Sequence, residues 1–250
     1  PFAMCAIDQA AYDLWGKQRT TPVHRLWKLD INHLPVSNFT IGIDTVENMI
    51  NKLQEVPDWP VYKIKLGTTD DLKIITELRR HTAATFRVDA NCGWAVDETI
   101  ANARQLRELG VEFIEQPLPA EDIDGSVRVY QHSVLPIMAD ESCITEPDVK
   151  NCKDQFHGIN IKLVKCGGLT PARRMIKQAR QLDLKVMVGC MTESTVGISA
   201  IAQLLPLLDF VDMDGAELLA EDIASGVRVE RGICHYSQLP GSGVQMLPTK

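Results

Sequence analysis

The chain has 250 residues, of which 33 are Asp or Glu and 26 are Lys or Arg, so its net charge is −7. An acidic chain without a basic block is poorly suited to polyanions, which argues against nucleic acid and anionic membranes as partners. Apolar residues make up 45% and charged residues 24%, as in ordinary globular proteins, and no run of roughly eighteen apolar residues could span a membrane.

The seven cysteines are odd in number and scattered, and no two of them form a C-x-x-C pair. This usage fits a reducing compartment better than a disulfide framework or a zinc site, so we expect a cytoplasmic protein. The cysteines are Cys5, Cys92, Cys143, Cys152, Cys166, Cys190 and Cys234.

The chain opens at Pro1, without Met or a signal peptide, and enters an amphipathic helical pattern over Ala3–Gly16. We therefore expect it to be part of a longer polypeptide. After a loop near Thr21 and Pro22, short β-type runs alternate with helical patterns along the chain.

The expected strands are Ser37–Ile43, Val61–Leu66, Thr85–Asp89, Glu112–Glu115, Pro136–Asp140, Gly158–Leu163, Lys185–Gly189 and Phe210–Asp214. The helical patterns between them are Thr45–Gln54, Thr69–His81, Asp97–Leu109, Pro171–Leu182 and Ser194–Leu207. This alternation predicts an α/β fold with parallel strands closed into a TIM-type (β/α) barrel. A doubly wound open sheet is the alternative, but the Gly-rich phosphate loop that usually follows its first strand is missing here. We assign residues 1–220 to the barrel with its leading helix, and 221–250 to an irregular, strand-like C-terminal segment.

The second expected strand carries two lysines on one face. Alternate residues of a barrel strand point inward, and the apolar Tyr62, Ile64 and Leu66 share the opposite face, so Lys63 and Lys65 point into the barrel. Two buried lysines need anionic partners or a catalytic task. The alternative is a solvated edge strand whose lysines lie in water.

Acidic residues end three consecutive expected strands at nearly equal intervals: Asp89, Glu115 and Asp140. This end of a barrel is where active sites lie. One such acid is most simply a helix N-cap, but three converging carboxylates repel one another unless a cation joins them. Oxygen-only ligands favour Mg²⁺ or Mn²⁺ over zinc.

The sixth expected strand directs Lys162 inward, on a strand well round the barrel from Lys65. Two lysines on opposite walls of a metal site suggest two bases that address opposite faces of one carbon. The alternative is that Lys162 only forms an ion pair with Asp140 or Glu141. Lys165, which opens the following loop, is expected to be structural.

The eighth expected strand ends in an Asp-x-Asp motif, Asp212 and Asp214, with Met213 between them facing the helices. A carboxylate pair away from the three strand-end acids is a suitable receptor for a substrate ammonium group. The motif alone is weak, and its value comes from its position. Asn91 and Glu141 flank the expected metal ligands and either orient them or serve only in turns and loops.

Together these residues resemble the enolase superfamily, in its muconate-lactonizing-enzyme-like branch. The matching motifs are Lys63-Ile-Lys65, Asp89-Ala-Asn91, Glu115-Gln-Pro117, Asp140-Glu-Ser142 and Asn160-Ile-Lys162. The resemblance implies that Asp89, Glu115 and Asp140 bind Mg²⁺. It also implies that Lys65 and Lys162 are the acid/base pair and that Lys63 lowers the pKa of Lys65. In this family an N-terminal α+β capping domain accompanies the barrel; the resemblance implies that it is absent from this chain and that residues 221–250 return toward it.

The Asp212-x-Asp214 motif resembles the signature of dipeptide epimerases of the L-Ala-D/L-Glu epimerase type. This implies an isomerase that inverts the α-carbon of a dipeptide's C-terminal residue by proton transfer between two lysines through an enediolate. One Mg²⁺ per site, with Mn²⁺ as a substitute, would stabilise that enediolate, and the family implies a homo-oligomer. The alternatives are an N-acylamino acid racemase, an o-succinylbenzoate synthase or a muconate-type cycloisomerase. A barrel without catalysis is disfavoured, since both lysines and all three acids are present.

Overall fold

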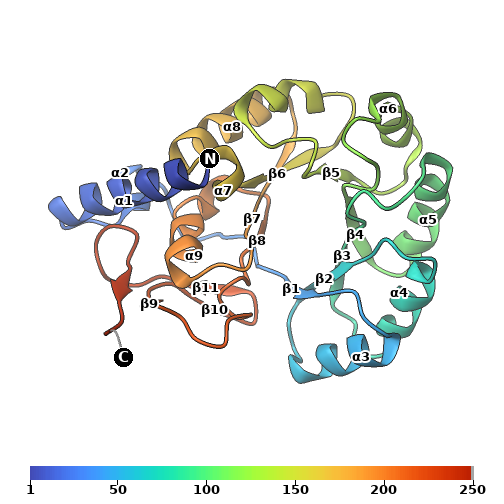
Figure 1. Ribbon diagram of the computed structural model, residues 1–250, viewed down its shortest axis with the longest axis horizontal. Coiled ribbons are helices and arrows are strands. Elements are labelled where there is room, and N and C mark those ends of the chain that lie inside the picture. The colour runs from blue at the N-terminus through green and yellow to red at the C-terminus, as the bar shows by residue number, and fades with distance from the viewer. Residues whose placement is uncertain (249–250) are drawn as a thin grey trace.

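The computed structural model describes residues 1–248, and its centre is a parallel sheet of eight strands in sequential order (Figure 1). A bridge between Ser37 and Val211 connects β8 back to the segment before β1. The strands are β1 (Phe39–Ile41), β2 (Val61–Lys65), β3 (Thr85–Asp89), β4 (Val111–Glu115), β5 (Ile137–Ala139), β6 (Gly158–Lys162), β7 (Lys185–Gly189) and β8 (Phe210–Asp212). The predicted α/β barrel is confirmed and the doubly wound alternative is wrong, because a doubly wound sheet reverses its strand order.

Helices and helical turns join successive strands and surround the barrel (Figure 1). They are α3 (Val46–Glu55), α4 (Asp71–Arg79), α5 (Val96–Glu108), α6 (Ile123–His132), η1 (Glu146–Cys152), α7 (Leu163–Cys166), α8 (Leu169–Gln181), α9 (Thr195–Ala202) and η2 (Leu205–Leu207). Two further helices precede the barrel, α1 (Phe2–Gln18) and α2 (Val23–Leu26), and α1 packs against α7 and α8. None of the described helices combines the length and apolar character needed to cross a membrane.

Helices α6 and α9 are among the elements that differ from the sequence prediction. Helix α6 was not predicted, because its Gly and β-branched Val residues are poor helix formers; the Asp122 carboxylate nevertheless caps it by accepting from Gly125 N at 2.9 Å. The helix expected over Ser194–Leu207 ends at Ala202, and a separate turn that contains Pro206 follows it. Proline lacks the N–H that would continue an α-helix.

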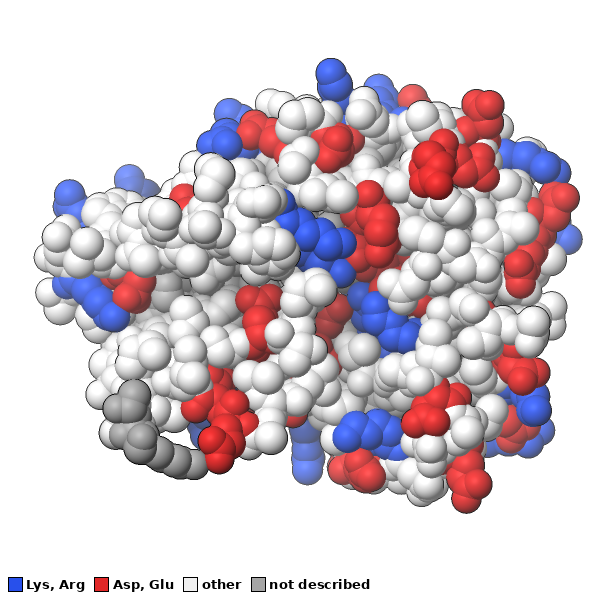
Figure 2. Space-filling model, viewed as in Figure 1, with Lys and Arg blue, Asp and Glu red and all other residues white. Residues whose placement is uncertain are grey.

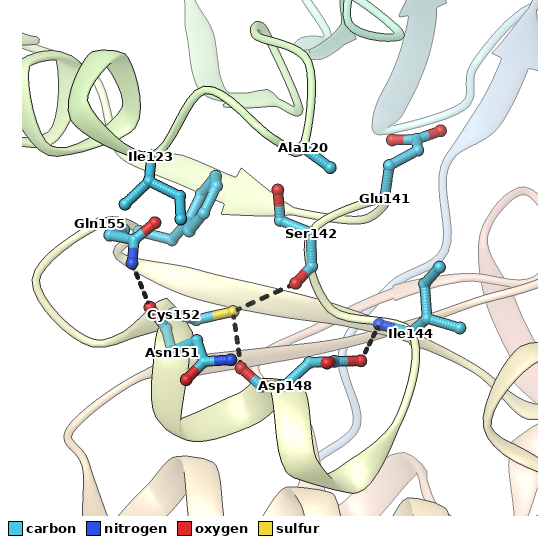
Figure 3. A pocket seen from close by; sticks show the side chains of 10 residues that line it. Ala120, Ile123, Glu141, Ser142, Ile144, Asp148, Asn151, Cys152 and Gln155 are labelled. Carbon is cyan, nitrogen blue, oxygen red and sulfur yellow. Dashed lines mark hydrogen bonds between the residues drawn. The ribbon is translucent and has the colours of Figure 1, made fainter.

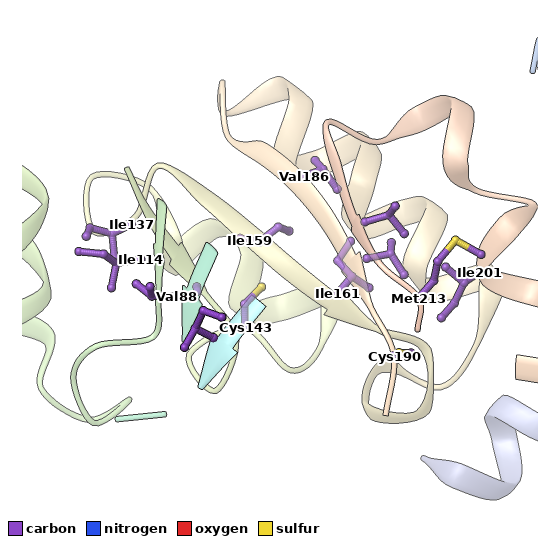
Figure 4. Close-up of a cluster of buried hydrophobic side chains, with 14 of the residues drawn as sticks. Val88, Ile114, Ile137, Cys143, Ile159, Ile161, Val186, Cys190, Ile201 and Met213 are labelled. Carbon is purple, nitrogen blue, oxygen red and sulfur yellow. The ribbon is translucent and has the colours of Figure 1, made fainter. Parts of the chain in front are cut away.

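The apolar core has two parts. Outward-facing strand residues pack against the helices, among them Val88, Ile114 and Ile161, and Met213 lies there beside Ile201, as predicted for Met213 (Figure 4). A smaller cluster fills the inside of the barrel. Its members, Phe113, Met138, Met187 and Phe210, each stand two residues before the strand position that faces the barrel mouth. The inner cluster therefore forms a floor below the polar mouth.

After β8 the described chain forms two short antiparallel pairs separate from the barrel sheet. These are β9 (Ala224–Ser225) with β12 (Gln245–Met246), and β10 (Arg228–Glu230) with β11 (Ile233–His235). The last two residues of the expected C-terminal segment, 249 and 250, lie outside the described residues.

We expect Phe113→Ala to lower the free energy of unfolding by about 3–5 kcal/mol, because it leaves a cavity in the barrel floor. Urea unfolding would measure this change. Phe2, which is 69% exposed on α1, provides the control, since Phe2→Ala should change stability by less than about 0.5 kcal/mol. Equal effects of the two substitutions would contradict a packed floor.

Candidate active site

The ammonium group of Lys63 lies in the barrel mouth among carboxylates. Its Nζ atom is 2.7 Å from Glu115 Oε2, 3.0 Å from Asp212 Oδ2 and 3.2 Å from Asp89 Oδ2. The side chain is 2% exposed and β2 lies between β1 and β3, so the solvated edge-strand alternative is wrong. Burial lowers the pKa of Lys63, but the three negative charges together raise it well above its usual range, so this lysine stays protonated.

The three strand-end acids lie on adjacent strands, where the sequence placed them. Asp89 and Glu115 are the last residues of β3 and β4, Asp140 directly follows β5, and all three are buried. Burial raises the pKa of Glu115 to about 7, and repulsion from Asp89 contributes to this shift. Burial also disfavours ionised Asp89, yet Lys63 and Lys65 lower its pKa to about 2.

Three further lysines reach these acids. Lys65 Nζ on β2 is 2.7 Å from Asp89 Oδ2, and Lys162 Nζ on β6 is 2.5 Å from Asp140 Oδ2. The ion pair between Lys162 and Asp140 that the sequence raised as an alternative is therefore present. Lys165 was expected to be structural, but its Nζ lies 2.8 Å from Asp140 Oδ1 and its side chain lines the cavity at the mouth, so it belongs to the site.

The Asp212-x-Asp214 pair is buried at the end of β8. The prediction that this pair lies away from the strand-end acids is wrong for Asp212. The Lys63 ammonium group contacts Asp212 together with Asp89 and Glu115. Burial raises the pKa of Asp212, but the interactions with its neighbours, above all with Lys63, outweigh this effect, so the net shift is downward. Burial and repulsion from Asp212 raise the pKa of Asp214 to about 7. Cys190 joins the pair, and ligand atoms of the three residues lie within 4.8 Å of one another.

A cavity of about 310 Å³ opens at the mouth and brings most of the predicted residues together. Figure 2 shows basic and acidic side chains gathered near the centre of the molecule in this view, over the barrel. The lining residues are Thr40, Lys63, Lys65, Asn91, Glu141, Lys162, Lys165, Cys190, Met191, Thr192, Asp212, Asp214 and Leu218. Asp89, Glu115 and Asp140 do not line it; they are buried and contact the lysines that do.

A second cavity of about 490 Å³ adjoins the site near Glu141 and Ser142 (Figure 3). Its other polar lining residues are Asp148, Asn151 and Gln155, and Figure 3 shows the Glu141 side chain directed away from them. Glu141 therefore lies at the boundary between the two cavities, since it lines both.

The side chain of Gln116, which received no role in the sequence analysis, connects two loops of the site. Its Oε1 atom accepts from Asp140 N at 2.9 Å and from Ser142 N at 3.1 Å. Its Nε2 atom donates to Leu118 O and to Ser142 Oγ, both at 2.8 Å. The signal was its place directly after Glu115, in a motif quoted for the resemblance.

Asp71 makes a similar connection between the loops after β2 and β3. Its Oδ2 atom accepts from Gly67 N at 2.8 Å and from Trp94 Nε1 at 2.7 Å. Asn91, on the same β3 loop, donates its backbone N–H to Asp89 Oδ1 at 3.0 Å. Asn91 therefore holds Asp89 through the backbone, while its side chain borders the cavity.

The charges and donor atoms at the mouth fit a hard divalent cation. Asp89, Glu115 and Asp140 offer only oxygen ligands. Six carboxyl groups meet four lysines at the mouth; they are Asp89, Glu115, Asp140, Glu141, Asp212 and Asp214, with Lys63, Lys65, Lys162 and Lys165. In the described structure Glu141 Oε2 is buried without a hydrogen-bond partner, whereas Glu115 Oε2 faces the Lys63 ammonium group at 2.7 Å.

Several known proteins that are similar to this chain are named as epimerases. Residues 46–250 match the family model for enolase C-terminal domain-like proteins. The chain is 57% identical to the L-Ala-D/L-amino acid epimerase of Flavobacterium johnsoniae, over 98% of this chain and 73% of that protein. It is 61% identical to the Maribacter sp. protein of the same name, with the same coverage. A dipeptide epimerase from Enterococcus faecalis, solved with Mg and L-Leu-L-Tyr, aligns with a TM-score of 0.91 and 30% identity, over 97% of this chain and 72% of that one.

The pKa of Asp214 predicts how its replacement affects stability. A folded-state pKa of about 7 lies above the roughly 3.9 of an unfolded Asp. The stability that Asp214 contributes is therefore fully present below about pH 4 and is lost as the pH rises through about 7. We expect Asp214→Asn, which cannot ionise, to be more stable relative to the original protein at pH 8 than at pH 5.

Urea unfolding at the two pH values would measure this difference. Asp124→Asn, at an exposed position on α6, is the control and should behave alike at both. A free-energy difference for Asp214→Asn that is independent of pH would show that Asp214 is already ionised at pH 5.

Proposed function

We propose, from the premise that this chain belongs to the enolase C-terminal domain-like family, that it is a Mg²⁺-dependent dipeptide epimerase. The enzyme would be an isomerase that inverts the α-carbon of a dipeptide's C-terminal residue. The observation that carries the proposal is the mouth cavity, which Lys65 and Lys162 line from β2 and β6 together with the carboxylates Asp212 and Asp214. The names of the similar proteins support it.

The two lysines move the proton. Lys65 would remove the α-proton from one face of the carbon, and Lys162 would return a proton to the other face, with the roles exchanged in the reverse reaction. A lysine acts as a base only when neutral, so one of the two is neutral and the other protonated in each turnover. Lys63 and Lys65 both contact Asp89 Oδ2, so a second ammonium group lies beside the proposed base.

Asp89, Glu115 and Asp140 are the residues that would hold Mg²⁺, with Mn²⁺ as a substitute. When bound, Mg²⁺ supplies positive charge that offsets the negative charge developing on the substrate carboxylate as the α-proton leaves. Asn91 would orient Asp89 through its backbone N–H, and Glu141 would help to orient the metal ligands from the edge of the cavity. The E. faecalis structure, solved with Mg and a dipeptide, supports the proposal that this protein uses Mg²⁺.

Asp212 and Asp214 would bind the α-ammonium group of the dipeptide. Both are buried, both line the cavity, and repulsion between them raises the pKa of Asp214. A cation placed between two such carboxylates relieves that repulsion and forms charge-assisted hydrogen bonds. A substrate with an acylated amine carries no positive charge there and would not form these ionic interactions with the pair.

We expect Lys65→Ala and Lys162→Ala each to reduce epimerisation by a factor on the order of 10³ or more, because each removes one of the two proton-transfer groups. In D₂O with Mg²⁺ and a pooled dipeptide library, mass spectrometry and chiral analysis would follow the α-carbon. Each variant should still exchange the α-proton of one isomer. Lys177→Ala, at an exposed position on α8, is the matched control and should retain full activity. Similar epimerase activity in both active-site variants would remove the two-base mechanism.

We expect Asp212→Asn to raise KM for dipeptides with a free amine by about tenfold or more, since it removes a buried charge that faces the ammonium group. N-succinylamino acids, assayed in parallel, test the other function. Turnover of N-succinylamino acids or of a cyclohexadiene acid, without turnover of any dipeptide, would keep the family and replace the proposed activity by that of a racemase or an o-succinylbenzoate synthase.

A further inference from the structure

A buried arginine lies within the barrel floor, below the ammonium-binding pair. Arg87 stands two residues before Asp89 on β3 and is 3% exposed. Its guanidinium carbon lies 5.4 Å from the ring centroid of Phe113 and 5.1 Å from that of Phe210. Its Nε atom donates to Glu112 Oε2 at 2.8 Å and its Nη1 atom to Val211 O at 3.0 Å. The side chain is therefore fixed in position on several sides.

Asn38 connects this arginine to Asp212. Arg87 Nη1 donates to Asn38 Oδ1 at 3.3 Å, and Asn38 Nδ2 donates to Asp212 Oδ1 at 2.8 Å. A guanidinium group can only donate hydrogen bonds and a carboxylate can only accept them. The amide must therefore present its oxygen to Arg87 and its nitrogen to Asp212. Asn38 is fully buried, so no water competes for these contacts.

Asp212 is consequently held at both oxygens, by Asn38 at Oδ1 and by Lys63 at Oδ2. This fixes the plane of the carboxylate where it borders the cavity. The hydrogen bond from Asn38 also favours the ionised form, and it is among the interactions that lower the pKa of Asp212. Orientation and charge are the two properties that a receptor for an ammonium group requires.

We propose that Asn38 and Arg87 are positioning residues that fix the orientation and charge of Asp212, and thereby set how tightly the site holds the ammonium group of its substrate. This inference rests on the proposed dipeptide epimerase function. Asn38 contacts this carboxylate directly and Arg87 contacts Asn38, so replacing Asn38 should have the larger effect.

The barrel provides a matched control on the opposite side of Lys63. Asn160 on β6 is also fully buried, and its Nδ2 atom donates to Glu115 Oε1 at 2.6 Å. The two asparagines therefore have the same chemistry toward different acids. Asn38 contacts the acid assigned to the ammonium group, whereas Asn160 contacts an acid assigned to the metal ion.

The experiment compares Asn38→Leu with Asn160→Leu, each of which removes one amide donor at nearly constant volume. We expect Asn38→Leu to raise KM for free-amine dipeptides about tenfold, with kcat changed less than about threefold, since a hydrogen bond to a charged group is lost. Asn160→Leu should instead raise the Mg²⁺ concentration that gives half-maximal activity and leave KM at saturating Mg²⁺ nearly unchanged. A general loss of packing would move the same parameters in both variants.

An activity-independent measurement separates this inference from the proposed function. In protein labelled with ¹³C at the Asp carboxyl carbons, with Asp212→Asn to assign the signal, NMR titration should show Asp212 taking up its proton at higher pH in Asn38→Leu. Asn160→Leu should not shift it. If Asn38→Leu does not fold, Asn38→Ala removes the same donor without the branched side chain, and Arg87→Lys should shift the titration in the same direction by less.

If the original protein turns over no dipeptide but Asn38→Leu still shifts the Asp212 titration, the proposed function is overturned and the positioning role stands. An unchanged titration and an unchanged KM in a folded Asn38 variant would overturn the positioning role.

Discussion

The arrangement of the barrel mouth depends on one buried cation, the ammonium group of Lys63. Without it, Asp89, Glu115 and Asp212 would be buried carboxylates that repel one another, an arrangement costing several kcal/mol per charge. With it, the ends of β3, β4 and β8 are connected through a single atom of β2. Lys63 therefore both compensates the acids and fixes their relative positions. A neutral residue of the same length could do neither.

Hydrogen bonds between loops add the precision that this ion cluster alone would lack. Gln116 connects the loops after β4 and β5, Asp71 connects those after β2 and β3, and Asn38 connects β8 to the barrel floor. These side chains are buried, so their hydrogen bonds persist without competition from water. Groups oriented in this way before a substrate arrives do not need to be reorganised during the reaction. The polar mouth is therefore supported by buried side chains that are polar as well.

The sequence predicted the parts of the site that follow from strand periodicity. Once β2 is recognised, the alternation of side chains places Lys63 and Lys65 inside, and the regular spacing of acids places Asp89 and Glu115 at neighbouring strand ends. Lys165 could not be placed in the cavity from periodicity because it lies on the short helix α7, where strand alternation no longer applies. Asn38 and Gln116 gained no role because their partners are distant in sequence and only three-dimensional proximity reveals them. Arg87 also received no role, although strand alternation predicts that it shares the inward face of β3 with Asp89.

The fixed cation between two groups of acids also explains how the proposed site would orient its substrate. A dipeptide is a zwitterion, with a carboxylate at one end and an ammonium group at the other. Lys65, Lys162 and a bound divalent cation attract the carboxylate, while Asp212 and Asp214 repel it and attract the ammonium group. Lys63 repels an ammonium group from the space between these two regions. A reversed dipeptide would meet unfavourable charge at both ends, so the same charges that stabilise the acids would present the α-carbon of the C-terminal residue to the two lysines.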